Sequence, residues 1–227
     1  MTNPQSAIAL EGLERRYGDR PALRGVSIAV GEGQTLAVFG ANGAGKTTLL
    51  RVLATLLRPH AGSAVVLGAS LPEEAWRVRG RVGFLGHEPL LYPDLTAREN
   101  LLFHARLHGV ATARVDELLD QVGLSPRAGD VVRELSRGMV QRVAVARAVL
   151  HDPAVLLLDE PRAGLDPGAA EELEPLIGRA SGRTRVIVTH DVERGLREAD
   201  VVLGLRAGAP ELAGGRAAAD EVRRLYS

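Results

Sequence analysis

The sequence predicts an α/β protein: a mostly parallel sheet, an antiparallel β subdomain at the N-terminus and a helical subdomain inserted in the middle. Three observations lead to this prediction. Apolar runs in the second half are continuous rather than alternating, which is typical of strands buried on both faces. Segments with helical spacing separate these runs, as in a parallel sheet covered by helices. A glycine-rich stretch, GANGAGKT at residues 40–47, joins an apolar run directly to a helical segment.

The elements follow from the residue patterns in chain order. The turn-forming GDRP at residues 18–21 separates the first two apolar runs and predicts a hairpin. Apolar runs that predict strands lie at residues 7–17, 22–30, 34–40, 62–68, 81–86, 154–160, 184–190 and 201–206. Helical spacing occurs at residues 46–59, 94–109, 115–124, 137–151, 167–180 and 191–200. Pro59 is expected to end the first of these helices, and residues 207–220 are expected to form a short loop and a helix.

The organisation expected from this pattern is a single domain over residues 1–227. Residues 1–86 and 152–227 are expected to form the α/β core with its β subdomain. Residues 87–151 are expected to form the helical subdomain. A chain of 227 residues is long enough to bury a substantial core.

Composition excludes several classes of function. The formal net charge is zero and no long basic run occurs, which argues against a nucleic-acid-binding surface. Without cysteine, the chain forms no disulfide and no thiolate metal site. No apolar stretch reaches membrane-spanning length, and the first residues lack the order of a signal peptide. We therefore expect a cytoplasmic protein that contacts the inner face of the cell membrane only through partners.

The stretch at residues 40–47 matches the phosphate-binding pattern G-x-x-x-x-G-K-T. Its context, a buried strand before it and a helix after it, aims the free amides of the helix N-terminus at a phosphate. The chain has 28 lysine and arginine residues together, and Lys46 is the only lysine. A compact ammonium fits a loop that closes tightly on its ligand better than a planar guanidinium does. The residues predicted to bind nucleotide here are Gly40, Asn42, Gly43, Ala44, Gly45, Lys46, Thr47 and Thr48.

Two acids end the apolar run VLLLDE at residues 155–160. The C-terminal ends of parallel strands are where open α/β sheets bind their ligands. Asp159 is therefore suited to hold Mg²⁺ together with the Thr47 hydroxyl, and Glu160 to polarise a water molecule. The alternative is a strand end with two solvated acids, which the phosphate loop disfavours.

Three further positions are weaker candidates. Ser136 in LSRGM is placed to cap the next helix, and Gly138 lets an anion approach its first turn, although capping alone explains the serine. His190 ends the run RVIVTH on the expected ligand edge of the sheet. Tyr17, taken alone, is a packing residue. His104 and His108 are four residues apart and are interpreted as one helix face rather than a metal site.

Taken together, these motifs resemble the ATP-binding subunit of ABC transporters over about residues 7–206. The resemblance rests on the order of Tyr17, the loop GANGAGKT, LSRGM, LLLDEP, AGLD at residues 163–166, and His190. It implies a core of the RecA-like P-loop NTPase type, with ATP and Mg²⁺ as ligands and ATP hydrolysis coupled to transport.

The resemblance also implies a role for each matching residue. Tyr17 would stack on adenine, Lys46 would bind the β- and γ-phosphates, and Glu160 would be the general base. His190 would contact the γ-phosphate. Ser136 and Gly138 would reach the ATP of a second copy, so that a head-to-tail homodimer encloses two ATP molecules with Asp166 at the interface. Residues 87–95 and the helical subdomain would contact membrane-spanning permease subunits.

Three residues depart from the family pattern. His87 stands where the family usually has glutamine, and we expect it near the metal and the γ-phosphate. Met139 replaces the glutamine of the signature, and Arg162 follows DEP where small or hydroxylated residues are common. Within the family, the chain looks most like the haem exporter ATPase of cytochrome c maturation. Export ATPases for drugs or lipids, and single-cassette ATPases of iron–sulfur assembly, remain alternatives.

Overall fold

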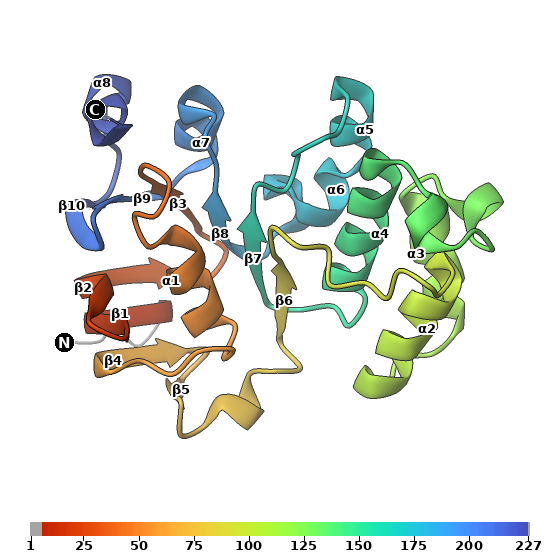
Figure 1. The fold of residues 1–227 in the computed structure, drawn as a ribbon, viewed down its shortest axis with the longest axis horizontal. Coiled ribbons are helices and arrows are strands. Elements are labelled where there is room, and N and C mark those ends of the chain that lie inside the picture. Colours follow the sequence, from red (N-terminus) through yellow and green to blue (C-terminus); the bar gives the residue numbers. More distant parts are fainter. Residues whose placement is uncertain (1–5, 227) are drawn as a thin grey trace.

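Two β-sheets and a helical part make up residues 6–226, which the computed structural model describes (Figure 1). The first sheet is antiparallel and has the strand order β2-β1-β4-β5. The second has the order β10-β9-β3-β8-β7-β6, and its strands are parallel except β10. The strands are β1 Ser6–Tyr17, β2 Arg20–Gly31, β3 Thr35–Phe39, β4 Ala61–Val66, β5 Ala69–Leu71, β6 Val82–Leu85, β7 Val155–Asp159, β8 Thr184–Val188, β9 Val201–Arg206 and β10 Ala209–Gly214.

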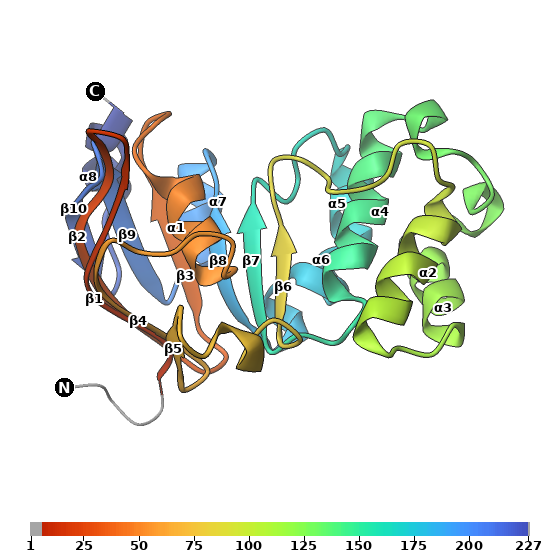
Figure 2. The same cartoon turned by 60° about the horizontal axis from the view of Figure 1, so that its bottom comes forward.

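Helices cover both faces of the parallel sheet. Helix α1 lies between the two sheets, in a core cluster that joins residues of β1 and β2 to β3 and β8 (Figure 2). Helices α7 and α8 pack near β3 and β9 on the other face, where Phe39 and Val202 contact Val222 and Leu225 in a small cluster. The α-helices are α1 Lys46–Leu53, α2 Ala97–His108, α3 Ala113–Gln121, α4 Arg137–Val149, α5 Pro167–Glu172, α6 Glu174–Ile177, α7 Val192–Glu198 and α8 Ala219–Arg223.

Helices α2, α3 and α4 share a second hydrophobic cluster with the edge of the parallel sheet, which they contact through Leu85, Leu156 and Leu158. Helix α2 begins at a capping box, in which Thr96 and Glu99 satisfy each other's backbone amides. These elements form the helical part that the sequence predicts. None of the helices described is long and apolar enough to span a membrane.

The structure confirms the predicted hairpin, the continuous buried strands and the parallel sheet, and corrects three expectations. Helix α1 ends at Leu53 rather than near Pro59, because Thr55 adopts a left-handed conformation with φ of 62°. The segment 167–180 is not one helix: α5 ends before Leu173, and α6 starts afresh with Pro175 in its first turn. The expected loop after residue 207 contains strand β10.

Candidate active site

A cavity of about 740 Å³ opens where the antiparallel subdomain faces the C-terminal ends of the parallel strands. Its walls come from the β1–β2 hairpin, the glycine-rich loop, the start of α1 and the ends of β7 and β8. Its size is in the range of small-molecule and cofactor sites. The lining residues are Tyr17, Arg20, Pro21, Ala22, Asn42, Gly43, Gly45, Lys46, Thr47, Thr48, His87, Asp159, Glu160, Ala163, Val188 and His190.

The glycine-rich loop requires glycine at two positions because of close backbone contacts. Gly40 has φ of 142°, and a Cβ there would lie 2.2 Å from the carbonyl oxygen of Leu205. Gly45 has φ of 108°, and its Cβ would lie 2.3 Å from the carbonyl oxygen of Ala22. Helix α1 begins at the next residue without a side-chain cap, so its first amides remain available to an anion.

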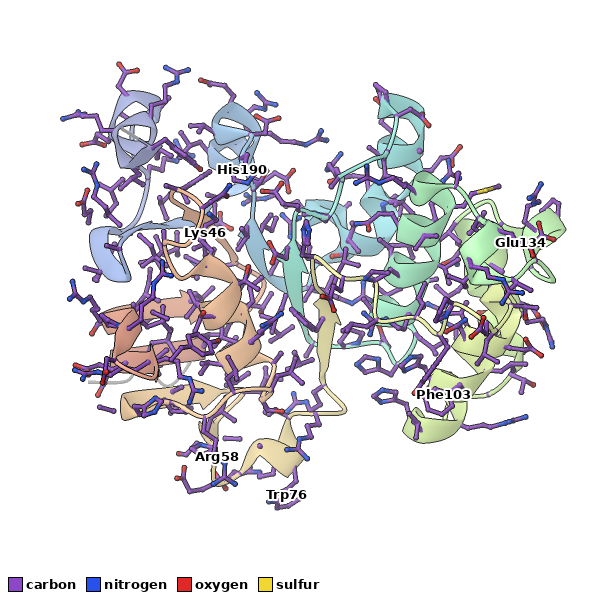
Figure 3. The ribbon with its side chains drawn as sticks, viewed as in Figure 1. Lys46, Arg58, Trp76, Phe103, Glu134 and His190 are labelled. Carbon is purple, nitrogen blue, oxygen red and sulfur yellow. The ribbon has the colours of Figure 1, made fainter. Side chains whose placement is uncertain are left out.

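Lys46 is 7% exposed at the base of the cavity. Its ammonium donates hydrogen bonds to the carbonyl oxygens of Gly40, at 2.6 Å, and Ala41, at 3.0 Å. Burial lowers the pKa of Lys46, and the negative charges of Asp159 and Glu160 partly offset this effect. Figure 3 shows Lys46 and His190 in the same region of the molecule.

Thr47 and Asp159 meet across the cavity from different elements. The Thr47 hydroxyl donates a hydrogen bond of 2.9 Å to Oδ2 of Asp159, which is 5% exposed at the end of β7. A hydroxyl and a carboxylate are hard oxygen ligands that suit Mg²⁺, which usually takes few protein ligands and completes its shell with water and phosphate. The residues present therefore fit the predicted metal.

Glu160 has the most perturbed carboxyl of the site. Its backbone is left-handed, with φ of 50°, and its buried Oε1 lies 3.3 Å from Nε2 of His190, outside hydrogen-bond geometry. Burial and the neighbouring charge of Asp159 raise the pKa of Glu160 to about 7, against the lowering effects of Lys46, the His190 backbone and His87. A carboxyl in the wall of a cavity with a pKa near neutrality has the properties of a general base.

Two residues of the β1–β2 hairpin lie at the cavity mouth: Tyr17, which the sequence predicts, and Arg20, which it does not. Tyr17 is 45% exposed there, and the Arg15 guanidinium lies 5.2 Å from the centre of its ring. Arg20 pairs with Tyr17 in the register of the hairpin, which brings both side chains to the cavity. The predicted hairpin already pairs Tyr17 with Arg20 if its turn is placed at residues 18 and 19, so this register would have identified Arg20.

Several predicted residues do not line the cavity. Gly40 and Ala44 belong to the loop but are buried and do not line the cavity. Ser136 caps α4 by accepting the amide of Met139 at 3.3 Å, which confirms the capping interpretation. A Cβ at Gly138 would lie 3.3 Å from the carbonyl oxygen of Gly164, so that the signature segment faces AGLD instead. Contact of Ser136 and Gly138 with nucleotide therefore stays a prediction about a second copy.

His87 lies in the wall of the main cavity and of an adjoining one that also includes Asp159 and Glu160. This position agrees with the expectation that it lies near the reacting groups, and its role toward a metal stays a prediction. In the described residues no cluster of three His, Cys, Asp or Glu side chains is arranged to hold a metal ion. His104 and His108 both lie in α2.

Arg162, the third departure from the family pattern, has a structural partner. Its guanidinium forms an ion pair with Glu174 at the start of α6 and lies 3.6 Å from Glu198 at the end of α7. Glu198 also pairs with Arg185, at 2.9 Å, and with Arg194, at 3.3 Å. Arg162 therefore ties the segment after Glu160 to the helices that follow β7 and β8.

Comparison with known proteins agrees with this geometry. The family model described as "ABC transporter" matches residues 23–163. The chain is 44% identical over 200 residues to a daunorubicin resistance ATP-binding protein, DrrA3, of Streptomyces coeruleorubidus, covering 86% of this chain and 62% of that protein. It is 41% identical over 201 residues to the Nod factor export ATP-binding protein I of Ralstonia nicotianae, covering 85% and 62%. The chain thus spans less than two thirds of the length of these two relatives.

Solved structures match the whole fold. One, described as the ATP-binding subunit of an ABC transporter, superposes with a TM-score of 0.87 at 27% identity and covers 97% of this chain and 99% of its own. Another, the cassette MJ0796 in a dimeric post-hydrolysis state with ADP and phosphate, gives 0.82 at 27% identity and covers 93% and 99%. The sequence resemblance and the fold class are confirmed: the chain belongs to the ABC transporter family and carries the ATP-binding ATPase domain of that family.

Proposed function

We propose that this chain hydrolyses ATP to power transport by an ABC exporter. The observation that carries the proposal is that one cavity brings together three sets of groups. They are Lys46 with the free amides of α1, the hydrogen-bonded pair Thr47 and Asp159, and Glu160 beside His190. These groups can bind phosphates, hold Mg²⁺ and accept a proton, which are the requirements of phosphoryl transfer to water.

In the proposed mechanism the loop amides from Asn42 to Thr48 and the Lys46 ammonium bind the phosphates, and Tyr17 stacks on the adenine. Thr47 and Asp159 would hold Mg²⁺, which would neutralise charge on the phosphates. Glu160 accepts a proton from the attacking water while the oxygen of that water bonds to the γ-phosphorus. The bond to the bridging oxygen breaks, and ADP and inorganic phosphate are the products. His190, placed beside Glu160, contacts the γ-phosphate.

We further propose that the active form is a head-to-tail homodimer, in which Ser136 and Gly138 of each copy reach the ATP bound by the other. The MJ0796 cassette is dimeric in its solved structures, which supports this proposal. The helical part and residues 87–95 then serve as the contact with membrane-spanning permease subunits, which would place the protein at the inner face of the membrane.

The cargo class is proposed from the relatives. One relative is named for daunorubicin resistance and another for Nod factor export, which supports an export ATPase and, among the predicted cargoes, drugs. Haem export for cytochrome c maturation, which the sequence predicts, remains a proposal that the names of these two relatives do not support. An iron–sulfur assembly ATPase is the alternative from another class.

Two measurements test the proposed function. The purified protein should release phosphate from Mg-ATP, and Asp159→Asn, which weakens the metal ligand, should abolish this release. Purification from detergent-solubilised membranes should then recover a permease with the wild-type chain. Hydrolysis without any membrane partner would favour the soluble alternative, whereas a partner without hydrolysis would contradict the ATPase proposal itself.

A further inference from the structure

A projecting tryptophan lies at the corner of the molecule where the antiparallel subdomain meets β6. Trp76 is the only tryptophan of the chain, and it is 75% exposed in a short 3₁₀ turn, Ala75–Arg77. Figure 3 shows Trp76 and Arg58 at the same lower edge of the molecule, far from Lys46 and His190. Leu56, on the segment that follows α1, is 58% exposed.

Two segments form this corner, residues 51–60 and residues 72–81. Arg79 ties them together, because its Nε donates a hydrogen bond of 3.2 Å to Oγ1 of Thr55. Pro59 and His60 also line one small cavity together with Pro72 and Glu73. We name this surface the tryptophan corner, defined by Arg58, Trp76, Arg77, Arg79 and Arg81.

The tryptophan corner is strongly basic although the chain as a whole has no net charge. The two segments contain five arginines and two glutamates, which gives them a formal charge of +3. One of these acids, Glu74, is occupied by the Ser70 amide and by Arg77. The exposed side chains of Arg58 and Arg81 have no acidic partner in residues 6–226. Their charge is therefore available to an anionic partner.

The chemistry of this surface fits a lipid headgroup layer. An indole partitions to the boundary between headgroups and acyl chains, because its ring is apolar and its N–H remains hydrated. Arginines around the indole bind lipid phosphates while their stems cover apolar surface. A projecting ring requires a soft surface to enter, and a fluid bilayer supplies it without a preformed pocket.

We propose that the tryptophan corner binds the surface of a membrane rich in anionic phospholipids, with Trp76 inserted at headgroup depth. Contact with the membrane is then direct as well as through permease subunits. The proposal is independent of ATP hydrolysis, because the corner lies outside the cavity that contains Lys46 and Glu160.

The single tryptophan gives a direct readout. The purified full chain is mixed with vesicles of phosphatidylglycerol and phosphatidylcholine, or of phosphatidylcholine alone, at low salt. With the anionic vesicles, Trp76 emission should shift to the blue and be quenched by lipids brominated on their acyl chains. The protein should co-sediment with the same vesicles and detach as the salt concentration rises. Phosphatidylcholine alone should give neither effect.

Variants distinguish binding through the tryptophan corner from adsorption through the net charge of the protein. The double change Arg58→Ser and Arg81→Ser should weaken binding to anionic vesicles by roughly 25-fold, from about fivefold per arginine. Trp76→Ser should also weaken co-sedimentation. The control, Arg197→Ser with Arg216→Ser, removes the same charge from two exposed sites outside the corner and should change binding little. ATP hydrolysis in solution should be equal in all four proteins.

Three outcomes overturn the proposal. The first is an unchanged Trp76 spectrum with anionic vesicles at low salt. The second is an equal loss of binding in the control variant, which would show adsorption through net charge. The third is a Trp76 that becomes buried only in a detergent-solubilised complex with a permease, which would assign the corner to a protein partner.

Discussion

The imidazole Nε2 of His190 lies 3.3 Å from Oε1 of Glu160, and the two side chains come from the ends of neighbouring parallel strands. The Glu160 oxygen is buried, whereas the His190 ring is half exposed toward the cavity. This arrangement leaves one carboxylate oxygen facing a group that can donate a hydrogen bond to a phosphate. The two residues are 30 positions apart in the sequence, but adjacent parallel strands bring both side chains to the same edge of the sheet.

Glu160→Gln should bind ATP and hydrolyse it very slowly. The amide keeps the shape of the side chain but cannot accept the proton of the attacking water, so turnover should fall by roughly 10²- to 10⁴-fold. Calorimetry should give an ATP affinity close to wild type, and a phosphate-release assay should give the rate. A variant that hydrolyses ATP at more than a tenth of the wild-type rate would assign the base elsewhere.

The same variant tests the proposed dimer. If ATP holds two copies together, blocked hydrolysis should leave the closed form populated at saturating ATP. Light scattering should then give a mass close to twice 24.1 kDa. A monomer under these conditions would count against the head-to-tail arrangement, and Ser136→Arg in the same background serves as the control that should restore the monomer.

Lys46→Arg should lose most of the ATP affinity even though the charge is retained. The ammonium lies under the loop, bonded to two carbonyl oxygens of the loop itself, and the side chain is almost fully buried. A guanidinium is wider and planar, and it cannot enter without opening the loop. We expect at least a tenfold rise in the dissociation constant by calorimetry. An affinity within about twofold of wild type, a difference under 0.5 kcal/mol, would show that charge alone is sufficient.

Much of this site could be predicted from the sequence, because its groups belong to local patterns. The loop, Thr47, Asp159 and Glu160 each lie at a junction of strand, turn and helix, and these junctions are visible in the order of apolar and polar residues. Arg20 was missed because its place depends on the hairpin register. Tyr226, whose hydroxyl lies 3.4 Å from the Gly40 amide, was missed because that contact joins residues 186 positions apart.

The errors in the fold have the same origin. Apolar spacing continues to Leu57, so the pattern gave no sign that the chain leaves the helix at Ala54 and that Leu56 is exposed. Strand β10 has few apolar side chains, and it is a strand because β9 offers a free edge. Pairing with β9 fixed β10, which local periodicity does not reveal.

Arg162→Ser should destabilise the protein but leave the nucleotide-binding cavity intact. The guanidinium is mostly buried between Glu174 and Glu198, so its removal leaves Glu174 without its partner. We expect a loss of about 1 to 3 kcal/mol in the free energy of unfolding, measured by urea denaturation. The double variant with Glu174→Gln should lose less than the sum of the two single changes. Strict additivity would mean that the ion pair contributes nothing.

A cluster of histidines should make the protein sensitive to acid. The rings of His108 and His151 stack with centroids 4.1 Å apart and an interplanar angle of 11°. Nε2 of His151 lies 3.1 Å from the carbonyl oxygen of Val82, to which it donates in that tautomer, and its Nδ1 is buried without a partner in the described residues. Burial lowers the pKa of both His104 and His151 to about 4, and the charge of Arg147 adds to this effect.

The direction of the pH effect follows from these values. An unfolded histidine has a pKa near 6.5, so between pH 6.5 and 4 the unfolded chain binds protons that the folded chain does not. The histidine contribution to stability is therefore intact above pH 6.5, falls as the pH drops toward 4, and levels off below that. Two effects raise the pKa of His151, the hydrogen bond to Val82 and the charge of Asp152, and each is smaller than the lowering caused by burial.

His151→Gln should flatten this dependence. Glutamine can still donate to the Val82 carbonyl but takes up no proton, so the variant should lose less stability than wild type between pH 6.5 and 4. The slope should fall by up to about 1.4 kcal/mol per pH unit, the limit for one proton. Urea unfolding followed by circular dichroism across that range measures the slope, and His60→Gln, which changes an exposed histidine, is the control. Carboxyl groups titrate alike in all three proteins, so only the differences are informative. Parallel curves for wild type and His151→Gln would show that the cluster does not govern acid stability.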